Sequence, residues 1–173
     1  MFRKYFYLIF ILFLTAQVKA NNIATLNIEV ILTKSVAAQN AAAQIKEKLD
    51  LYQIEINKKS ELLKREQNDL MQQSNILTQE ALEAKQRDFV AKIQNLENEV
   101  KEKKQQLDSL YVKAVSQIET NIGEIIKEIS KEENYNLILA SNDIIYAHNI
   151  ADLTEKVLNI LNKKLTKVEI SAE

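Results

Sequence analysis

Hydrophobic residues recur at every seventh position through the first half of the chain. One row is apolar throughout and consists of Leu49, Ile56, Leu63, Leu70 and Leu77. A companion row becomes polar toward its end and consists of Ile45, Tyr52, Lys59, Glu66 and Gln73. Apolar rows that repeat in this way are typical of helices that supercoil around a partner. The pattern predicts a long helix over residues 35–77.

The pattern breaks near Thr78 and then resumes. Its second part contains Leu82, Gln86, Phe89, Ile93, Leu96, Val100, Lys103, Leu107, Leu110 and Ala114, of which only Gln86 and Lys103 are polar. Thr78 suits a helix N-cap, and Glu80 follows in the first turn, where an acidic side chain favours the helix dipole. We therefore expect a second helix over residues 79–133 that folds back on the first. A continuous helix that pairs with another chain is the alternative, since no glycine or proline marks the turn.

Both ends of the chain carry short apolar runs. Residues 23–28 predict a strand, and residues 29–33 predict a helical turn. Residues 136–140 and 144–147, joined by Ser-Asn-Asp, predict a β-hairpin. Asn134 is expected to end the long helix in a left-handed conformation. Asp152 and Glu155 have the spacing of a capping box, so a last helix should begin there, and the charged tail beyond residue 162 is expected to fray.

These elements define the predicted organisation. Residues 35–133 form a helical hairpin arm, residues 21–34 and 134–162 form a small β body with a C-terminal helix, and residues 163–173 form a charged tail. The fold class is α+β, mainly α, with a long antiparallel coiled-coil hairpin on a small β body. Three short strands and one helix bury little by themselves, and open sheet edges favour association. Several chains are therefore expected to pool their strands.

Composition narrows the function classes. The 173 residues include no proline, no cysteine, no tryptophan and one glycine, Gly123. Glycine-rich phosphate loops, disulfide frameworks and thiolate zinc sites are thereby excluded. Gly123 lies inside the second long helix, where it is expected either to allow close helix approach or to be a tolerated defect. We expect no catalytic residue, no metal site and no cofactor.

The first twenty residues have the pattern of a secretory signal peptide. Arg3 and Lys4 precede a short apolar run, and Val18 and Ala20 are small or aliphatic residues where a peptidase would cut. Cleavage is predicted between Ala20 and Asn21, and an uncleaved membrane anchor is the alternative. Cleavage would remove three basic residues and no acidic residue from the formal charge of -1, which leaves 20 basic and 24 acidic residues. The mature chain is therefore mildly acidic.

The charges of the predicted arm are balanced and interspersed. Between Lys46 and Lys113 there are 13 basic and 13 acidic residues. This is typical of a solvated coiled-coil exterior, whereas a nucleic-acid groove needs a basic stripe with interleaved aromatic residues. Carboxylates such as Glu61, Glu66 and Asp69 do not indicate acid–base catalysis, because an exposed coiled coil does not shift their pKa values as catalysis demands. His148, the single histidine, is expected to have a surface or hydrogen-bonding role.

The order of these parts resembles the Skp/OmpH family. The first strand, the charged helical hairpin and a C-terminal motif carry the resemblance. That motif matches at Tyr146, Ala147, Asp152, Leu153, Thr154 and Val157. The resemblance implies a Skp-like trimer in the periplasm that acts as an ATP-independent holdase. Three hairpin arms would enclose a cavity and keep unfolded outer-membrane β-barrel proteins from aggregating, with membrane contact only during export or client delivery.

The charge of this chain departs from the family pattern. Family members often have a basic character, whereas this mature chain is acidic, so we carry over no lipopolysaccharide site. Steering of clients should then depend more on apolar contact, or on local patches such as Lys58-Lys59 and Lys64-Arg65.

Apolar residues outside the heptad rows are the candidate client-binding residues: Leu51, Ile54, Leu62, Met71, Ile76 and Val90. Exposed aliphatic and methionine side chains suit promiscuous contact. The simpler interpretation is that Leu62 and Ile76 widen the seam and that the others are ordinary scattered apolar residues. A structural or adaptor coiled coil of the cell envelope is the alternative function.

Overall fold

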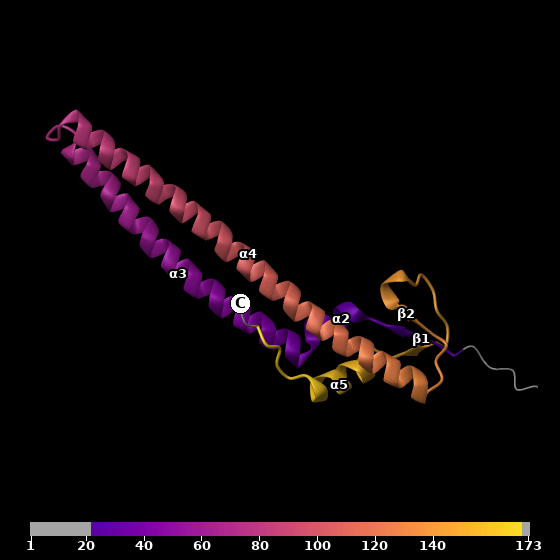
Figure 1. The fold of residues 1–173 in the computed structure, drawn as a ribbon. Coiled ribbons are helices and arrows are strands. Elements are labelled where there is room, and N and C mark those ends of the chain that lie inside the picture. Colours follow the sequence, from indigo (N-terminus) through magenta and orange to yellow (C-terminus); the bar gives the residue numbers. More distant parts are fainter. Residues whose placement is uncertain (1–21, 171–173) are drawn as a thin grey trace, which may run out of the picture.

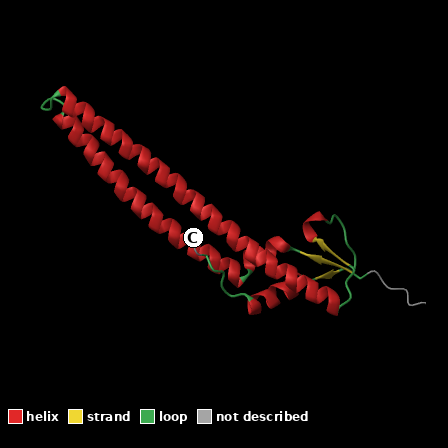
Figure 2. Cartoon of the chain, viewed as in Figure 1, coloured by secondary structure: helices red, strands yellow, loops and turns green. Residues whose placement is uncertain are grey.

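The protein is a long antiparallel helical hairpin that projects from a small body (Figures 1 and 2). The computed structural model describes residues 22–170, so the predicted signal peptide and its cleavage site lie outside the described residues. Helix α3 (Val36–Gln73) runs outward to the tip of the arm, and helix α4 (Gln79–Glu132) returns and continues into the body. The predicted fold class, a helical hairpin with a small sheet, is confirmed.

Side-chain caps start each of the first three helices. Asn27 accepts a hydrogen bond from the Val30 amide and begins α2 (Ile28–Lys34), and Ser35 accepts one from the Ala38 amide and begins α3. At the tip, the Thr78 side chain accepts a hydrogen bond from the Ala81 amide and begins α4. A free first turn leaves backbone N–H groups without partners, and these caps satisfy one of them at each helix. At the tip, the cap at Thr78 allows α4 to begin directly after the turn at residues 74–78, which contains no glycine or proline.

The sheet has three parallel strands with the first strand in the centre. Strand β1 (Ile23–Leu26) pairs in parallel with β2 (Leu137–Ala140) on one side and with β3 (Ala151–Asp152) on the other. The predicted β-hairpin is therefore wrong. Residues 136–140 do form a strand, but its partner is β1, which reaches it only after the chain has travelled the whole arm. Local periodicity shows that a segment suits a strand and does not show which strand it pairs with.

Residues 141–150 leave the sheet. A 3-10 turn, Ser141–Asp143, follows β2, and residues 144–147 then run as an exposed loop instead of a second hairpin strand. Asn134 and Asn149 both have positive φ angles, 57° and 56°, so the left-handed conformation predicted for Asn134 is confirmed. Asparagine tolerates this region because its short polar side chain bonds locally.

The last helix, α5 (Thr154–Lys164), begins later than predicted. Its N-cap is Leu153, which makes no capping bond through its side chain, so the predicted capping box at Asp152 is wrong. The Asp152 carboxylate instead accepts hydrogen bonds from the amide and the hydroxyl of Thr154, at 2.8 and 2.5 Å. Asp152 is held in β3 by sheet pairing, and this fixes its carboxylate one residue before the cap.

One stripe of α4 forms the centre of the core. Its buried residues follow at steps of three or four and are Leu110, Ala114, Ile118, Ile122, Ile125 and Ile129. They pack with Leu26 of β1, Ile31 of α2 and Leu161 of α5 in one apolar cluster. Gly123 is not part of this packing, since a Cβ added there would meet no atom within 4 Å. Of the two interpretations of Gly123, the structure favours the tolerated defect.

The C-terminal segment is packed, in contrast to the predicted fraying. Residues 165–170, which we call the strap, leave α5 and run back along the base of the arm (Figure 1). Val168 is fully buried and Ile170 is 9% exposed. The side-chain amide of Gln44 on α3 donates to the Val168 carbonyl, and that of Gln117 on α4 donates to the Glu169 carbonyl, both at 3.4 Å. The strap therefore bridges both helices of the arm.

The arm itself is held by a ladder of polar contacts between the two helices. The contacts join Tyr52 with Gln106, Lys59 with Glu99, Glu66 with Lys92, and Gln73 with Lys85. Each step of seven residues along α3 is matched by a step of seven back along α4, so the ladder has one constant register. The polar residues of the companion row, Lys59, Glu66 and Gln73, thus have polar partners on α4. The apolar row is mostly half-buried, and Leu49 and Val100 are exposed.

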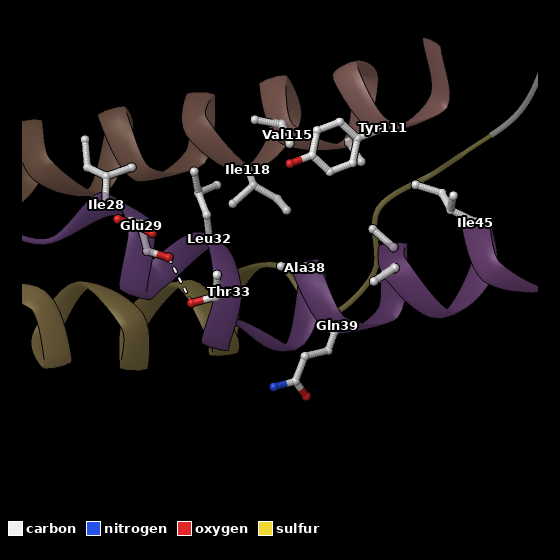
Figure 3. A pocket seen from close by; sticks show the side chains of 13 residues that line it. Ile28, Glu29, Leu32, Thr33, Ala38, Gln39, Ile45, Tyr111, Val115 and Ile118 are labelled. Carbon is white, nitrogen blue, oxygen red and sulfur yellow. Dashed lines mark hydrogen bonds between the residues drawn. The ribbon is translucent and has the colours of Figure 1, made fainter. Parts of the chain in front are cut away.

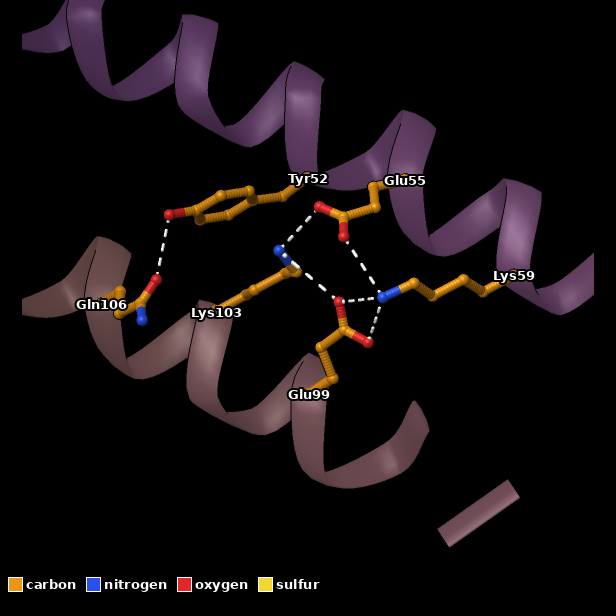
Figure 4. A network of polar contacts seen from close by, with 6 residues as sticks. All are labelled: Tyr52, Glu55, Lys59, Glu99, Lys103 and Gln106. Carbon is orange, nitrogen blue, oxygen red and sulfur yellow. Dashed lines mark hydrogen bonds and ion pairs between the residues drawn. The ribbon is translucent and has the colours of Figure 1, made fainter. Parts of the chain in front are cut away.

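The ladder is densest around Lys103, one of the two polar residues of the second heptad pattern (Figure 4). Its ammonium group lies 2.8 Å from Glu55 and 4.1 Å from the centre of the Tyr52 ring, a cation–π contact. Lys59 bonds Glu55 and Glu99 in turn, at 3.2 and 2.7 Å. Hydrogen bonds from Lys103 and then Lys59 lower the pKa of the Glu55 carboxyl to about 2. Hydrogen bonds that Lys59 donates to the carboxylates of Glu99 and Glu55 raise the pKa of Lys59.

Truncation of the strap's buried side chain should destabilise the base of the arm. The Val168→Ala variant is expected to lose about 2 kcal/mol of unfolding free energy, because it leaves a cavity where Val168 is fully enclosed. Urea unfolding followed by circular dichroism measures the loss. The matched control is Lys167→Ala, one residue away and exposed, and an equal effect of the two substitutions would contradict the packing of the strap.

The Glu55 network should make arm stability depend on acid. The pKa of Glu55 in the folded state lies below its ordinary value of 4.5, so its contribution is present above that pH and is lost as the pH falls toward about 2. The difference in melting temperature between the wild type and Glu55→Gln should therefore be seen above pH 4.5 and vanish near pH 2. Glu61→Gln is the control, because Glu61 forms no ion pair within residues 22–170. A difference that persists unchanged at pH 2 would refute the assignment.

Candidate functional site

The body exposes large apolar side chains beside an open sheet edge. Leu137 and Leu139 alternate along β2 and are 46% and 39% exposed, and in the following loop Ile145 and Tyr146 are almost wholly exposed. Within the described chain, the outer edges of β2 and β3 pair with no further strand. We call Leu137, Leu139, Ile145 and Tyr146, which lie on β2 and in the loop that follows it, the body patch.

The body patch has the chemistry of an association surface. Two neighbouring large apolar residues that project into water, next to unpaired backbone groups, favour contact with another polypeptide. Because β2 is an edge strand, a partner could add hydrogen bonds along it as well as bury Leu137 and Leu139. The apolar run at residues 144–147 predicts a strand, whereas in the structure Ile145 and Tyr146 lie in an exposed loop and are accessible for such contact.

The C-terminal motif divides into two parts with different environments. Tyr146 and Ala147 lie in the exposed loop, whereas Leu153, Thr154 and Val157 are buried. The Thr154 hydroxyl accepts a hydrogen bond from the Asn27 amide at 2.9 Å and donates to Asp152. The Leu153 amide donates to the Thr25 carbonyl, also at 2.9 Å. This second part joins the start of α5 to the end of β1, so its residues hold the body together.

All six candidate client-binding residues are exposed on the arm. Their exposed fractions run from 51% at Val90 to 83% at Ile76. They occupy several heptad positions, so they do not form a single stripe. Leu62 also borders a shallow depression between the helices with Leu63 and Leu96. The arm thus presents dispersed apolar side chains in a charged surface, which suits weak contact at many points better than one tight site.

The two predicted basic patches differ in their surroundings. Lys59 is engaged with Glu55 and Glu99 across the arm, so it is a structural cation. Lys58, Lys64 and Arg65 are exposed and make no ion pair within the part of the chain that the structure describes. The Glu66 carboxylate accepts a hydrogen bond from the Lys92 ammonium group at 2.6 Å. Some charges of the arm therefore join the two helices, and others face solvent.

The described residues also bear on other kinds of site. Among residues 22–170 there is no group of three or more histidine or acidic side chains placed to hold a metal ion. No helix in the same range is long and apolar enough to cross a membrane. His148 is exposed in the loop after β2.

Two apolar features at the base of the arm were not predicted. Val168 and Ile170 fall within the predicted charged tail, although their spacing of two residues is that of a half-buried extended segment. Tyr111 was missed because it lies next to the heptad row and outside it, and it is 63% exposed. Each could have been found by searching the charged segments for apolar residues at strand spacing or flanking the seam.

Comparison with a solved structure supports the same architecture. The chain is similar to a candidate outer membrane chaperone (OmpH-like) from Caulobacter crescentus CB15, with a TM-score of 0.81. The similarity covers 89% of this chain and 91% of that chain at 16% sequence identity, which establishes a shared fold. None of the curated proteins matches the chain in sequence.

The match to a protein family is more direct. The model of the family described as outer membrane protein (OmpH-like) matches residues 22–161, which include the whole sheet, both arm helices and most of α5. The resemblance seen in the C-terminal motif is therefore confirmed. This chain belongs to the OmpH-like outer membrane protein family.

Proposed function

We propose that this protein is an ATP-independent holdase chaperone that acts in the periplasm after its signal peptide is removed. It binds unfolded outer-membrane β-barrel proteins and prevents their aggregation. Family membership supports the general assignment as a chaperone. The observation that supports the mechanism is the dispersed set of exposed apolar side chains on an arm whose helices have 38 and 54 residues.

The physical chemistry of the arm fits such clients. An unfolded β-barrel chain exposes alternating apolar residues and unpaired backbone groups, and it aggregates through both. Dispersed contacts with residues such as Leu51, Ile54 and Met71 are individually weak, and many of them together retain the client by avidity. Binding lowers the concentration of free unfolded chain, and this slows aggregation without any chemical step or ATP.

Assembly through the body would place several arms around one client. The body patch and the open edges of β2 and β3 support association of bodies, while the arms project away from the body. The family resemblance implies three chains. Three arms around a common axis would enclose a cavity, and a client inside it would be kept from other unfolded chains.

The function is tested by diluting an outer-membrane β-barrel protein from urea into buffer with the purified mature chain and without ATP. Light scattering should stay low in its presence, because client and chaperone form a soluble complex. Replacing the six candidate client-binding residues by serine should restore part of the scattering while leaving the helical signal unchanged. If the wild type fails to suppress scattering, the holdase proposal is wrong. If the six-serine variant suppresses scattering as well as the wild type does, these six arm residues do not bind the client.

Assembly is tested separately through the body patch. The double substitution Ile145→Ser and Tyr146→Ser should shift the mass measured by light scattering from a trimer toward a monomer, because both side chains would lose their apolar contact. Lys163→Ser, an exposed change on α5, is the control. A wild-type protein that is already monomeric, or a variant with unchanged mass, would count against assembly through this patch.

A further inference from the structure

An apolar groove lies at the base of the arm, where α2 meets α3 and α4 (Figure 3). It has a volume of about 720 Å³. Small side chains on α3, namely Ala38, Ala41 and Ala42, line it beside larger apolar side chains on α2 and α4. The small side chains fill little of the space between the two long helices at this point.

The side chains around the groove leave apolar surface uncovered. Ile28 is 39% exposed and Tyr111 is 63% exposed, and both border the groove. The Tyr111 ring lies along the groove, with its hydroxyl directed toward Val115 and Ile118 (Figure 3). A tyrosine hydroxyl can donate a hydrogen bond to an incoming backbone carbonyl or accept one from a backbone amide.

The same pair of helices already binds an extended segment on its other side. There the strap inserts Val168 and Ile170, two residues apart, and Gln44 and Gln117 donate hydrogen bonds to its carbonyls. In a helix with about 3.6 residues per turn, Gln117 and Tyr111 lie on opposite sides of the row that contains Leu110 and Ala114. The groove and the strap therefore flank one seam.

The two sides of the seam between α3 and α4 differ in how they are covered. On the strap side, an extended segment of this chain covers the seam to Ile170. On the groove side, α2 borders one end of the groove through Ile28, Glu29, Leu32 and Thr33, and Ile45 and Tyr111 border the other end (Figure 3). The strap thus shows which kind of polypeptide this helix pair binds: an extended chain with apolar residues at alternate positions.

We propose that the groove is a docking site for an extended segment of an unfolded client, with alternate apolar side chains inserted between α3 and α4. This inference rests on the proposed holdase function and assigns it a defined site. Strands of outer-membrane β-barrels have the required alternation, since every second residue faces lipid. The groove lies where the arm joins the body, so a client held there is anchored while the rest of it contacts the arms.

Site-specific cross-linking tests the proposal, and the chain is suited to it because it contains no cysteine. Tyr111→Cys and Val112→Cys each provide one attachment point for a benzophenone maleimide. Residues 111 and 112 are equally exposed, at 63%, but only Tyr111 lines the groove. With an outer-membrane β-barrel protein diluted from urea as the probe, position 111 should give at least about fivefold more client cross-link than position 112, because a docked chain stays within reach of the groove residue.

A second measurement uses a charge placed in the groove. Ala42→Glu puts a carboxylate among its apolar side chains, whereas Ala43→Glu makes the same change on the next, exposed residue, which does not line it. A ten-residue peptide with alternating apolar and polar residues should bind the first variant about tenfold more weakly than the second, because burying an unpaired charge is costly. A scrambled peptide without alternation should bind weakly to both.

The outcomes separate this inference from the proposed function. Equal client cross-linking at positions 111 and 112, or equal peptide affinity of the two glutamate variants, would overturn the groove while wild-type suppression of aggregation still supports the holdase. Cross-linking of position 111 to a second copy of this chain would show that the groove is an interface between subunits and would also overturn it. Failure of the wild type to suppress aggregation would refute the proposed function itself.

Discussion

The apolar stripe of α4 is the interaction on which the rest of the structure depends. It runs from Leu110 to Ile129, and the sheet, α2, α5 and the strap all contribute to the cluster around it. Because α4 is one uninterrupted helix of 54 residues, about 80 Å long, this stripe also joins the body rigidly to the arm. A short protein can carry so long an arm because the single helix α4 belongs to both the arm and the body.

Beyond the stripe, a different physical balance holds the arm. Two helices alone cannot bury a full core, so the distal seam is half-buried and Leu49 and Val100 remain exposed. The polar ladder compensates by fixing the register, since each charged side chain finds its partner only when α3 and α4 are aligned in one way. Exposed ion pairs contribute little net stability, so the ladder's main effect is on alignment. The outer surface of the arm is thereby left exposed to solvent.

The heptad pattern predicted the hairpin well because helix signals are local. The rows of Leu49 to Leu77 and Leu82 to Ala114, the cap at Thr78 and the left-handed Asn134 all depend on neighbouring residues. The prediction of strand pairing was wrong because β1 pairs with β2, and the two strands are separated in the sequence by the whole arm. The packing of the strap could not be predicted for a similar reason. The lysines near Val168 indicate a solvated tail, and only the folded helix pair, with Gln44 and Gln117, gives the two apolar residues of the strap a place to be buried.

The candidate surfaces divide in the same way. The six exposed apolar residues of the arm could be identified from the sequence, because any residue outside the heptad rows of a two-helix arm faces water. The body patch and the groove could not, since each is formed by segments far apart in the chain. The sequence by itself determined the two long helices, the cap at Thr78 and the amphipathic seam, all set by contacts within a few turns. Tertiary structure alone decided which strand lies in the centre of the sheet, which side of the seam the strap covers and which side stays open, because packing between distant segments fixes these choices.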